Sequence, residues 1–312
     1  MHSAKLLSIH VDVDSPIILS RWYGHSSVNY DIKNLEIFYE NTFRRALSLF
    51  DEFGIKATFF CVGEEIEKSK HISNLLKEAC SRGHAIANHT FSHPFGINTL
   101  SKEKITKEIV KCSAAIKNAT GINPVGFRAP GYAIDTNVIN ILEETGIQYD
   151  SSAGWPLFHL LLKGIRLMKI INKNIKMDVG YGETNSFFRK SSYVPSEHNW
   201  KLISDKKRTI REFPLPTSFH LLPYYSNFHL SVPSFVRNTL INNVDNDYLI
   251  YLFHIIEFSS VHDDVIPNAI FQHPHIQVPF EKKIVFFRNV LTQIMKNRHS
   301  TLTENYIADG QF

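Results

Sequence analysis

The chain has 312 residues, of which 43% are hydrophobic, and a formal net charge of +4. This length and composition are sufficient for a large α/β domain with a sizeable core. The modest charge gives no electrostatic footprint for nucleic-acid binding, and we expect no nucleic-acid partner.

Compartment and membrane topology are predicted from the cysteines and the apolar runs. The three cysteines show neither a disulfide framework nor metal-ligand spacing, which favours a reducing compartment. The N-terminal sequence MHSAKLLSIHVDVDS has acidic residues where a secretory signal would remain apolar. The chain contains no run of about 18 apolar residues, so we expect no transmembrane helix. We therefore expect a cytoplasmic protein.

Apolar periodicity predicts alternating strands and helices through the first half of the chain. The predicted elements, in chain order, are a strand at 6–14, a helix at 34–54, a strand at 56–63, a helix at 64–83, a strand at 84–89, a helix at 101–121, a strand at 125–131, a helix at 135–146 and a strand at 147–152. Two further strands at 209–215 and 247–254 and a long helix at about 280–297 follow.

Strands that alternate with helices predict a parallel sheet. About seven strands favour a (β/α) barrel over an open sheet, although spacing alone does not decide between them. No linker is evident, so we predict a single domain over 1–312. The segment 156–210 fits no simple β/α unit and is predicted to be an insertion or lid.

The apolar stretch 156–177 contains basic residues at intervals and has no acidic residue. Two interpretations are open for this stretch. It forms either a helix that covers the barrel with a solvated basic face, or an amphipathic helix that lies on a membrane surface. The second interpretation predicts peripheral membrane contact.

Ionisable residues follow the ends of five predicted strands. The carboxyl ends of parallel strands are where the sites of α/β folds assemble, so we expect these side chains to converge. Packing alone does not explain the pattern. The residues are Asp12 and Asp14, His89 and His93, Arg128 and Tyr132, Asp150, and His254.

The His-x-x-x-His pattern of His89 and His93 predicts metal ligands when it is combined with Asp14. Pro94 disfavours a helix through His93, because the residue before proline is pushed away from the helical region. A single turn after a strand still lets both imidazoles converge. Two histidines and one carboxylate form a facial set that leaves positions open for water and substrate.

The pair of aspartates in HVDVDS requires an explanation of its own. An Asp-x-Asp step in a strand places both carboxylates on one face, where two like charges are unfavourable without a cation or a shared proton. If one aspartate binds a metal, the other can remain free as a base for bound water. Arg128 is expected to orient that base.

These residues resemble the motifs of the polysaccharide deacetylase family, the NodB-homology carbohydrate esterases. The resemblance covers about residues 5–155 and resumes near 248–258. Five motifs appear in the family's order: HVDVDS at 10–15, HTFSH at 89–93, RAP at 128–130, DSSAGWP at 150–156 and LFH at 252–254. The resemblance implies a distorted (β/α) barrel with about seven strands, in agreement with the predicted elements.

The family resemblance implies a role for each motif residue and a divalent metal, with zinc expected. The implied metal ligands are Asp14, His89 and His93. The implied catalytic residues are Asp12, Arg128, Asp150 and His254. The implied pocket residues are Pro130, Tyr132, Trp155 and Leu252.

The implied reaction is metal-assisted hydrolysis of an N-acyl group. Asp12 is the implied base and His254 the acid that protonates the leaving amine. Arg128 tethers the base, and Asp150 is expected to be the partner of His254. A backbone N–H near Tyr132 is expected to bind the oxyanion.

Val13 separates the two aspartates, whereas most family members have them adjacent. This spacing is similar to a cytoplasmic branch that includes lipid-linked aminosugar deformylases and peptidoglycan-deacetylase-like proteins. The resemblance implies an aminosugar substrate, with a nucleotide- or lipid-linked precursor expected. Two alternatives are a metal-free amidase of the allantoinase-like type and a non-catalytic glycan-binding barrel. The acyl group, the sugar and the oligomeric state remain open.

Overall fold

The computed structural model describes residues 5–25, 30–154, 189–219, 222–262, 264–271, 273 and 275–310. The strands are β1 (Lys5–Asp12), β2 (Ala57–Cys61), β3 (Ala85–Asn88), β4 (Gly126–Phe127), β5 (Tyr149–Asp150), β6 (Arg211–Glu212), β7 (Thr217–Ser218), β8 (Leu222–Pro223), β9 (Tyr248–His254) and β10 (Arg298–Ser300). The α-helices are α1 (Pro16–Trp22), α2 (Ile32–Glu52), α3 (Gly63–Lys68), α4 (Lys70–Ser81), α5 (Lys102–Thr120), α6 (Thr136–Glu144), α8 (Ser226–Ser231), α9 (Ser234–Asn242), α10 (Phe280–Met295) and α11 (Thr303–Ala308).

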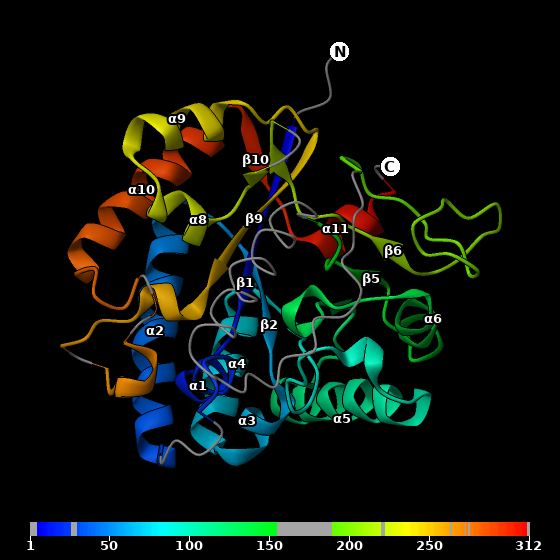
Figure 1. Ribbon diagram of the computed structural model, residues 1–312, viewed down its shortest axis with the longest axis horizontal. Coiled ribbons are helices and arrows are strands. Elements are labelled where there is room, and N and C mark those ends of the chain that lie inside the picture. The colour runs from blue at the N-terminus through cyan, green and yellow to red at the C-terminus, as the bar shows by residue number, and fades with distance from the viewer. Residues whose placement is uncertain are drawn as a thin grey trace, which may run out of the picture.

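Eight parallel strands form a curled sheet, and seven of them follow the order β9, β1, β2, β3, β4, β5, β6 (Figure 1). β10 joins β1 beside Lys5–Leu7, ahead of the point where β2 begins to pair. Within the described residues no pairing joins β6 to β9, so the sheet is a half-barrel. The predicted distorted (β/α) barrel with about seven parallel strands is confirmed.

Helices cover the outer face of this sheet. α2 packs on α4, α4 on α5 and α5 on α6, as Figure 1 shows along the outside of the strands. Leu7, Ile9 and Val11 of β1 are fully buried and face this layer. Since side chains alternate along a strand, Ser8, His10 and Asp12 face the inside of the curl. β1 therefore gives an apolar face to the core and a polar face to the barrel interior.

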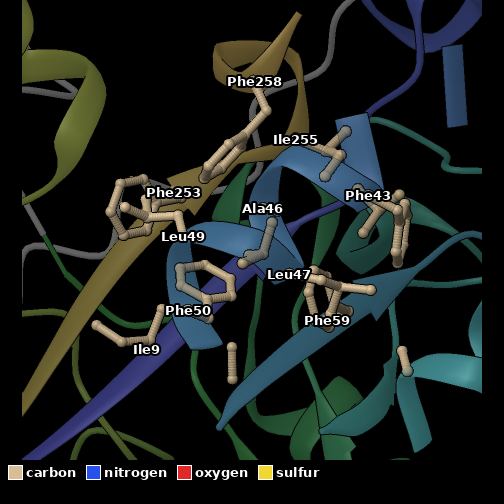
Figure 2. Packing of buried hydrophobic residues seen from close by; sticks show 14 of the residues in the cluster. Ile9, Phe43, Ala46, Leu47, Leu49, Phe50, Phe59, Phe253, Ile255 and Phe258 are labelled. Atoms are coloured by element: carbon tan, nitrogen blue, oxygen red, sulfur yellow. The ribbon is translucent and has the colours of Figure 1, made fainter. Parts of the chain in front are cut away.

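Phe50 of α2 lies at the centre of the outer core (Figure 2). Its ring lies 6.2 Å from that of Phe59 on β2 and 6.0 Å from those of Phe253 and Phe258, measured between centroids. One helix side chain thus packs against β2, against β9 and against the turn that follows β9. Aromatic contacts of this kind add to the free energy that burial already supplies.

The predicted helix at 64–83 is wrong at one point, because Ser69 divides it into α3 and α4. Ser69 is extended (φ −142°, ψ 124°) and its hydroxyl accepts hydrogen bonds from the N–H groups of His71 and Ile72. A serine that caps a new helix in this way competes with continuation of the old one.

Residues 156–188 of the predicted insertion lie outside the described residues, and so does Trp155 just before it. In the described remainder, Tyr193 pairs with Glu212 in an antiparallel bridge. Arg208 donates hydrogen bonds to Glu143 and Asn140 on α6. Residues 189–210 therefore pack onto the edge of the sheet and its neighbouring helix.

None of the helices that the structure describes has the length and apolarity needed to cross a bilayer.

Replacement of Phe50 by alanine is expected to lower the free energy of unfolding by about 3–5 kcal/mol, because a fully buried ring leaves a cavity between packed aromatic side chains. Phe235→Ala provides the matched control, since the Phe235 side chain is 74% exposed and its loss is expected to change stability by about 0.5 kcal/mol or less. Urea unfolding of both variants would measure the difference. Equal losses would contradict this description of the core.

Candidate active site

The register of the sheet brings the motif residues together. Asp12 is paired with His254 across β1 and β9. Asn88 is paired with Phe127 across β3 and β4, so the next residue of each segment, His89 and Arg128, lies at the same edge. The predicted convergence at the carboxyl ends of the strands follows directly from this pairing.

Asp14, His89 and His93 converge on one point. Oδ1 of Asp14 lies 3.4 Å from Nε2 of His89 and 3.2 Å from Nε2 of His93. Their ligand atoms all lie within 4.8 Å of one another, and no other such group occurs in the described part of the chain. The three residues are buried or nearly so, and side-chain exposure is largest for Asp14, at 15%.

The turn between the two histidines is not helical. Thr90 and His93 have positive φ angles of 66° and 56°, which L-residues rarely adopt. The Thr90 hydroxyl accepts a hydrogen bond from the His93 N–H at 3.1 Å and closes the turn. The predicted interruption at Pro94 is therefore confirmed, and the imidazoles converge through a strained turn instead of a helix face.

This donor set fits a zinc ion. Oδ1 of Asp14 is buried and makes no well-aligned hydrogen bond among the described residues, although two imidazole nitrogens lie within 3.4 Å. Ligands at zinc-bonding distance in a tetrahedral arrangement lie about 3.3 Å apart, which is close to both separations. The Nδ1 of His89 lies 2.7 Å from the Arg128 carbonyl oxygen. As an N–H donor there, this nitrogen leaves Nε2 free to bind metal.

Electrostatics also prepare Asp14 for a cation. Burial opposes ionisation of this carboxyl, but the charge of His93 and the contacts with both imidazoles outweigh it and hold the pKa of Asp14 well below its usual value. The carboxylate is thus the charged form at neutral pH.

Arg128 holds the other aspartate. Its Nη1 donates a 2.7 Å hydrogen bond to Oδ1 of Asp12, and both side chains are almost completely buried. Nε of Arg128 donates to the Ser151 carbonyl oxygen and Nη2 to the Ser151 hydroxyl. The guanidinium also lies 4.3 Å from the ring centroid of Phe60. These contacts fix the direction from which Asp12 is held, as predicted for a base tethered by arginine.

His10 is a site residue that the sequence analysis missed. Its Nδ1 lies 2.8 Å from Nη2 of Arg128, and its Nε2 lies 2.8 Å from the Thr303 hydroxyl. Burial and the charge of Arg128 hold the pKa of His10 well below its usual value, so the ring is neutral and accepts from the arginine. Its position two residues before Asp12, on the same face of β1, was the available signal.

His254 lies at the end of β9, and its ring faces Asp12 and Tyr132. Its Nε2 lies 3.9 Å from Oδ2 of Asp12 and 3.5 Å from the Tyr132 hydroxyl. Burial lowers the pKa of His254, but a hydrogen bond to Glu257 and the charges of Asp12 and Glu257 outweigh it and raise the pKa to about 9. The imidazole is therefore protonated at neutral pH, as a general acid requires.

The expected pairing of Asp150 with His254 is wrong. Nδ1 of His254 lies 3.4 Å from Oε1 of Glu257. Asp150 instead accepts a 2.6 Å hydrogen bond from the Ser152 hydroxyl, and Ser152 in turn accepts one from the Ala129 N–H. Through Ser152, the side chain of Asp150 therefore supports the backbone segment that carries Arg128.

Asp150 shares its buried position with Glu212 of the neighbouring strand β6. Burial raises the pKa of both carboxyls, and the proximity of Asp150 raises that of Glu212 further. Glu212 also accepts a hydrogen bond from the Ala153 N–H. The pair therefore belongs to the framework behind the site and not to its acid–base chemistry.

The predicted pocket residues have different surroundings. Pro130 is buried and begins the 3₁₀ turn η2 (Pro130–Tyr132), whose Tyr132 has a φ of 60° and points its hydroxyl to Asp12 at 3.4 Å. The Tyr132 N–H donates to the Ala129 carbonyl oxygen, so it is not available for an oxyanion. Leu252 is fully buried on the inner face of β9. Trp155 lies outside the described residues.

Removal of a ligand side chain is expected to abolish zinc binding. We expect His89→Ala and Asp14→Ala to lose bound zinc, because two protein donors hold the ion far less tightly than three. Asp12→Asn leaves all three donors intact and is expected to retain zinc. Metal analysis after dialysis, with circular dichroism to establish folding, would measure this. Stoichiometric zinc in His89→Ala would contradict the assigned ligand set.

Comparisons with known proteins agree with this geometry. Residues 28–149 match the family model described as polysaccharide deacetylase. The chain is 31% identical over 86 residues to a peptidoglycan-N-acetylglucosamine deacetylase of Bacillus cereus, covering 28% of this chain and 30% of that protein. It is 28% identical over 149 residues to a peptidoglycan deacetylase of Helicobacter pylori, covering 47% of this chain and 49% of that protein. The chain thus spans 30% of the length of the first relative and 49% of the length of the second.

A solved structure extends the similarity of fold to nearly the whole chain. A candidate polysaccharide deacetylase from Mycobacterium smegmatis superposes with a TM-score of 0.58 at 14% identity, covering 99% of this chain and 91% of that one. Residues 28–149 are thus similar to the polysaccharide deacetylase family, and the half-barrel and the order of the motif residues agree with that similarity.

Proposed function

We propose that the protein is a metal-dependent hydrolase that removes an N-acyl group from an aminosugar. The observation that supports this proposal is that a cation site, a base and an acid lie together at one edge of the sheet. Asp14 with its two imidazoles forms a cation site, while Asp12 and His254 approach each other beside it at 3.9 Å. A base and a protonated acid next to a Lewis acid are the parts that amide hydrolysis needs.

A zinc ion held by Asp14, His89 and His93 would polarise the amide carbonyl and make water more acidic. Asp12 accepts the proton of the attacking water through Oδ2, since Oδ1 is held by Arg128. His254 donates its proton to the leaving amine. Each residue supplies a step that the other cannot, because Asp12 is an acceptor and His254 is protonated at neutral pH.

The substrate is proposed to carry an N-acylated aminosugar. The relatives from B. cereus and H. pylori are named as peptidoglycan deacetylases, and another relative, from Cryptococcus neoformans, is named as a chitin deacetylase. The Asp-Val-Asp spacing supports a narrower proposal, a nucleotide- or lipid-linked precursor handled in the cytoplasm or at the inner membrane surface. Formyl and acetyl groups are both compatible with the site.

Two other functions receive less support. A metal-free amidase would not require three buried donors around one point. A non-catalytic glycan-binding barrel would not require a buried base tethered by arginine opposite a protonated histidine. The complete set of groups therefore favours the hydrolase.

Asp12→Asn is expected to reduce kcat by about 10²- to 10⁴-fold, because the amide retains the shape of the side chain but cannot accept the proton. Turnover should be measured on zinc-loaded protein whose metal content equals that of the wild type. Activity close to the wild-type rate would contradict the role of Asp12 as base.

Release of acetate and formate should be assayed on a panel of nucleotide-linked sugars, lipid-linked sugars and peptidoglycan fragments. We expect release from at least one N-acyl sugar, and loss of that release after zinc chelation with recovery when zinc is restored. His89→Ala is the matched negative control. Hydrolysis of polymer fragments alone would contradict the precursor proposal, and the absence of release from every sugar would contradict the proposed function.

A further inference from the structure

We propose that Glu257 is the positioning residue of His254, so that it fixes the imidazole and keeps its proton available for the leaving group. This inference rests on the proposed function and assigns to Glu257 the role that the family resemblance implied for Asp150. Glu257 lies three residues after His254, in the 3₁₀ turn η3 (Ile255–Phe258) that follows β9.

Glu257 contacts His254 at two points through one oxygen. Oε1 lies 3.2 Å from the backbone nitrogen of His254, which donates to it, and 3.4 Å from Nδ1 of the ring. The side chain of Glu257 is completely buried, and its Oε2 has no hydrogen-bond partner among the described residues. A buried carboxylate with so few donors interacts strongly with the cation beside it.

The ring nitrogens of His254 therefore have different surroundings. Nδ1 faces Glu257, whereas Nε2 faces Oδ2 of Asp12 at 3.9 Å and the Tyr132 hydroxyl at 3.5 Å. A proton on Nδ1 that is directed to Glu257 leaves Nε2–H as the group that points to the reacting centre. The same division of labour orients catalytic histidines that pair with a carboxylate.

Other groups surround His254 without taking this place. The Tyr225 ring, which precedes α8, lies 6.0 Å from the imidazole centroid. Asp14 adds negative charge from the segment that follows β1. In the loop before α10, burial and the charge of His254 lower the pKa of His273 and of His275. Among the described residues, Glu257 is the carboxylate that meets Nδ1.

A purely structural role is the competing explanation, because the same Oε1 caps the 3₁₀ turn through the His254 N–H. Glu257→Gln separates the two roles. Glutamine has the same size and an oxygen that accepts from the backbone, but it carries no charge. A capping role would survive this change, whereas stabilisation of the protonated imidazole would not.

The first test is a double-mutant cycle on zinc-loaded protein with the best substrate from the panel. We expect Glu257→Gln to lower kcat with little change in KM, and to move the basic limb of the kcat profile to lower pH. The loss is about tenfold for each unit by which the pKa of His254 falls below the assay pH. In a His254→Ala background, the same change is expected to have no further effect. An equal loss in both backgrounds, or an unchanged pH profile, would overturn the proposal.

The second test needs no turnover and stays informative if the proposed function fails. The full-length protein with bound zinc is labelled with ¹⁵N at its histidine rings, and His254→Ala identifies the His254 signals. We expect the carboxylate of Glu257 to hold the pKa of His254 in the wild type above the pKa of the same ring in the variant. In Glu257→Gln we expect its pKa to fall by at least one unit. Identical titration in both proteins would overturn the proposal even if the enzyme is active.

Discussion

Arg128 brings a full positive charge into the interior of the half-barrel, and Asp12 is its counterion. An ion pair at this depth is costly to desolvate and is tolerated only when its remaining hydrogen-bonding groups are satisfied. The surrounding structure meets that condition with Ser151, with neutral His10 and with the face of Phe60. Loss of either charged partner would leave the other charge buried and unpaired. The position of Asp12 is therefore fixed by electrostatics before any substrate binds.

The arrangement also explains why distant parts of the chain meet behind the site. The Thr303 hydroxyl at the start of α11 lies within 3.1 Å of a polar atom on Ser8, His10 and Tyr248. These residues come from β1 and β9, so the C-terminal helix closes the polar interior that the first strand opens. The outer face of the same strands is apolar and packs on α2 and α10. The alternation of side chains along β1 and β9 thus supplies both the polar interior of the half-barrel and the apolar core outside it.

Local sequence patterns predicted the features that depend on residues close together in the chain. The strands, the fold class and the triad follow from periodicity and from polar residues at strand ends, since the register of a parallel sheet aligns those ends. The break at Ser69 and helix α1, capped by Ser15 and Pro16, had capping signals that periodicity outweighed. The spacing of His10 from Asp12 indicates that both lie on one face of β1, but the contacts of His10 and Asp150 could not be predicted, because they depend on which strands become neighbours.

The first motif now has a physical explanation in its spacing. Val13 is fully buried in the outer core, so the residues on either side of it, Asp12 and Asp14, are directed to the interior. One carboxylate meets a guanidinium and the other meets two imidazoles, and His254 has a carboxylate of its own in Glu257. Each charge is balanced by a different partner. A base, an acid and a cation site can therefore coexist at one sheet edge without neutralising one another.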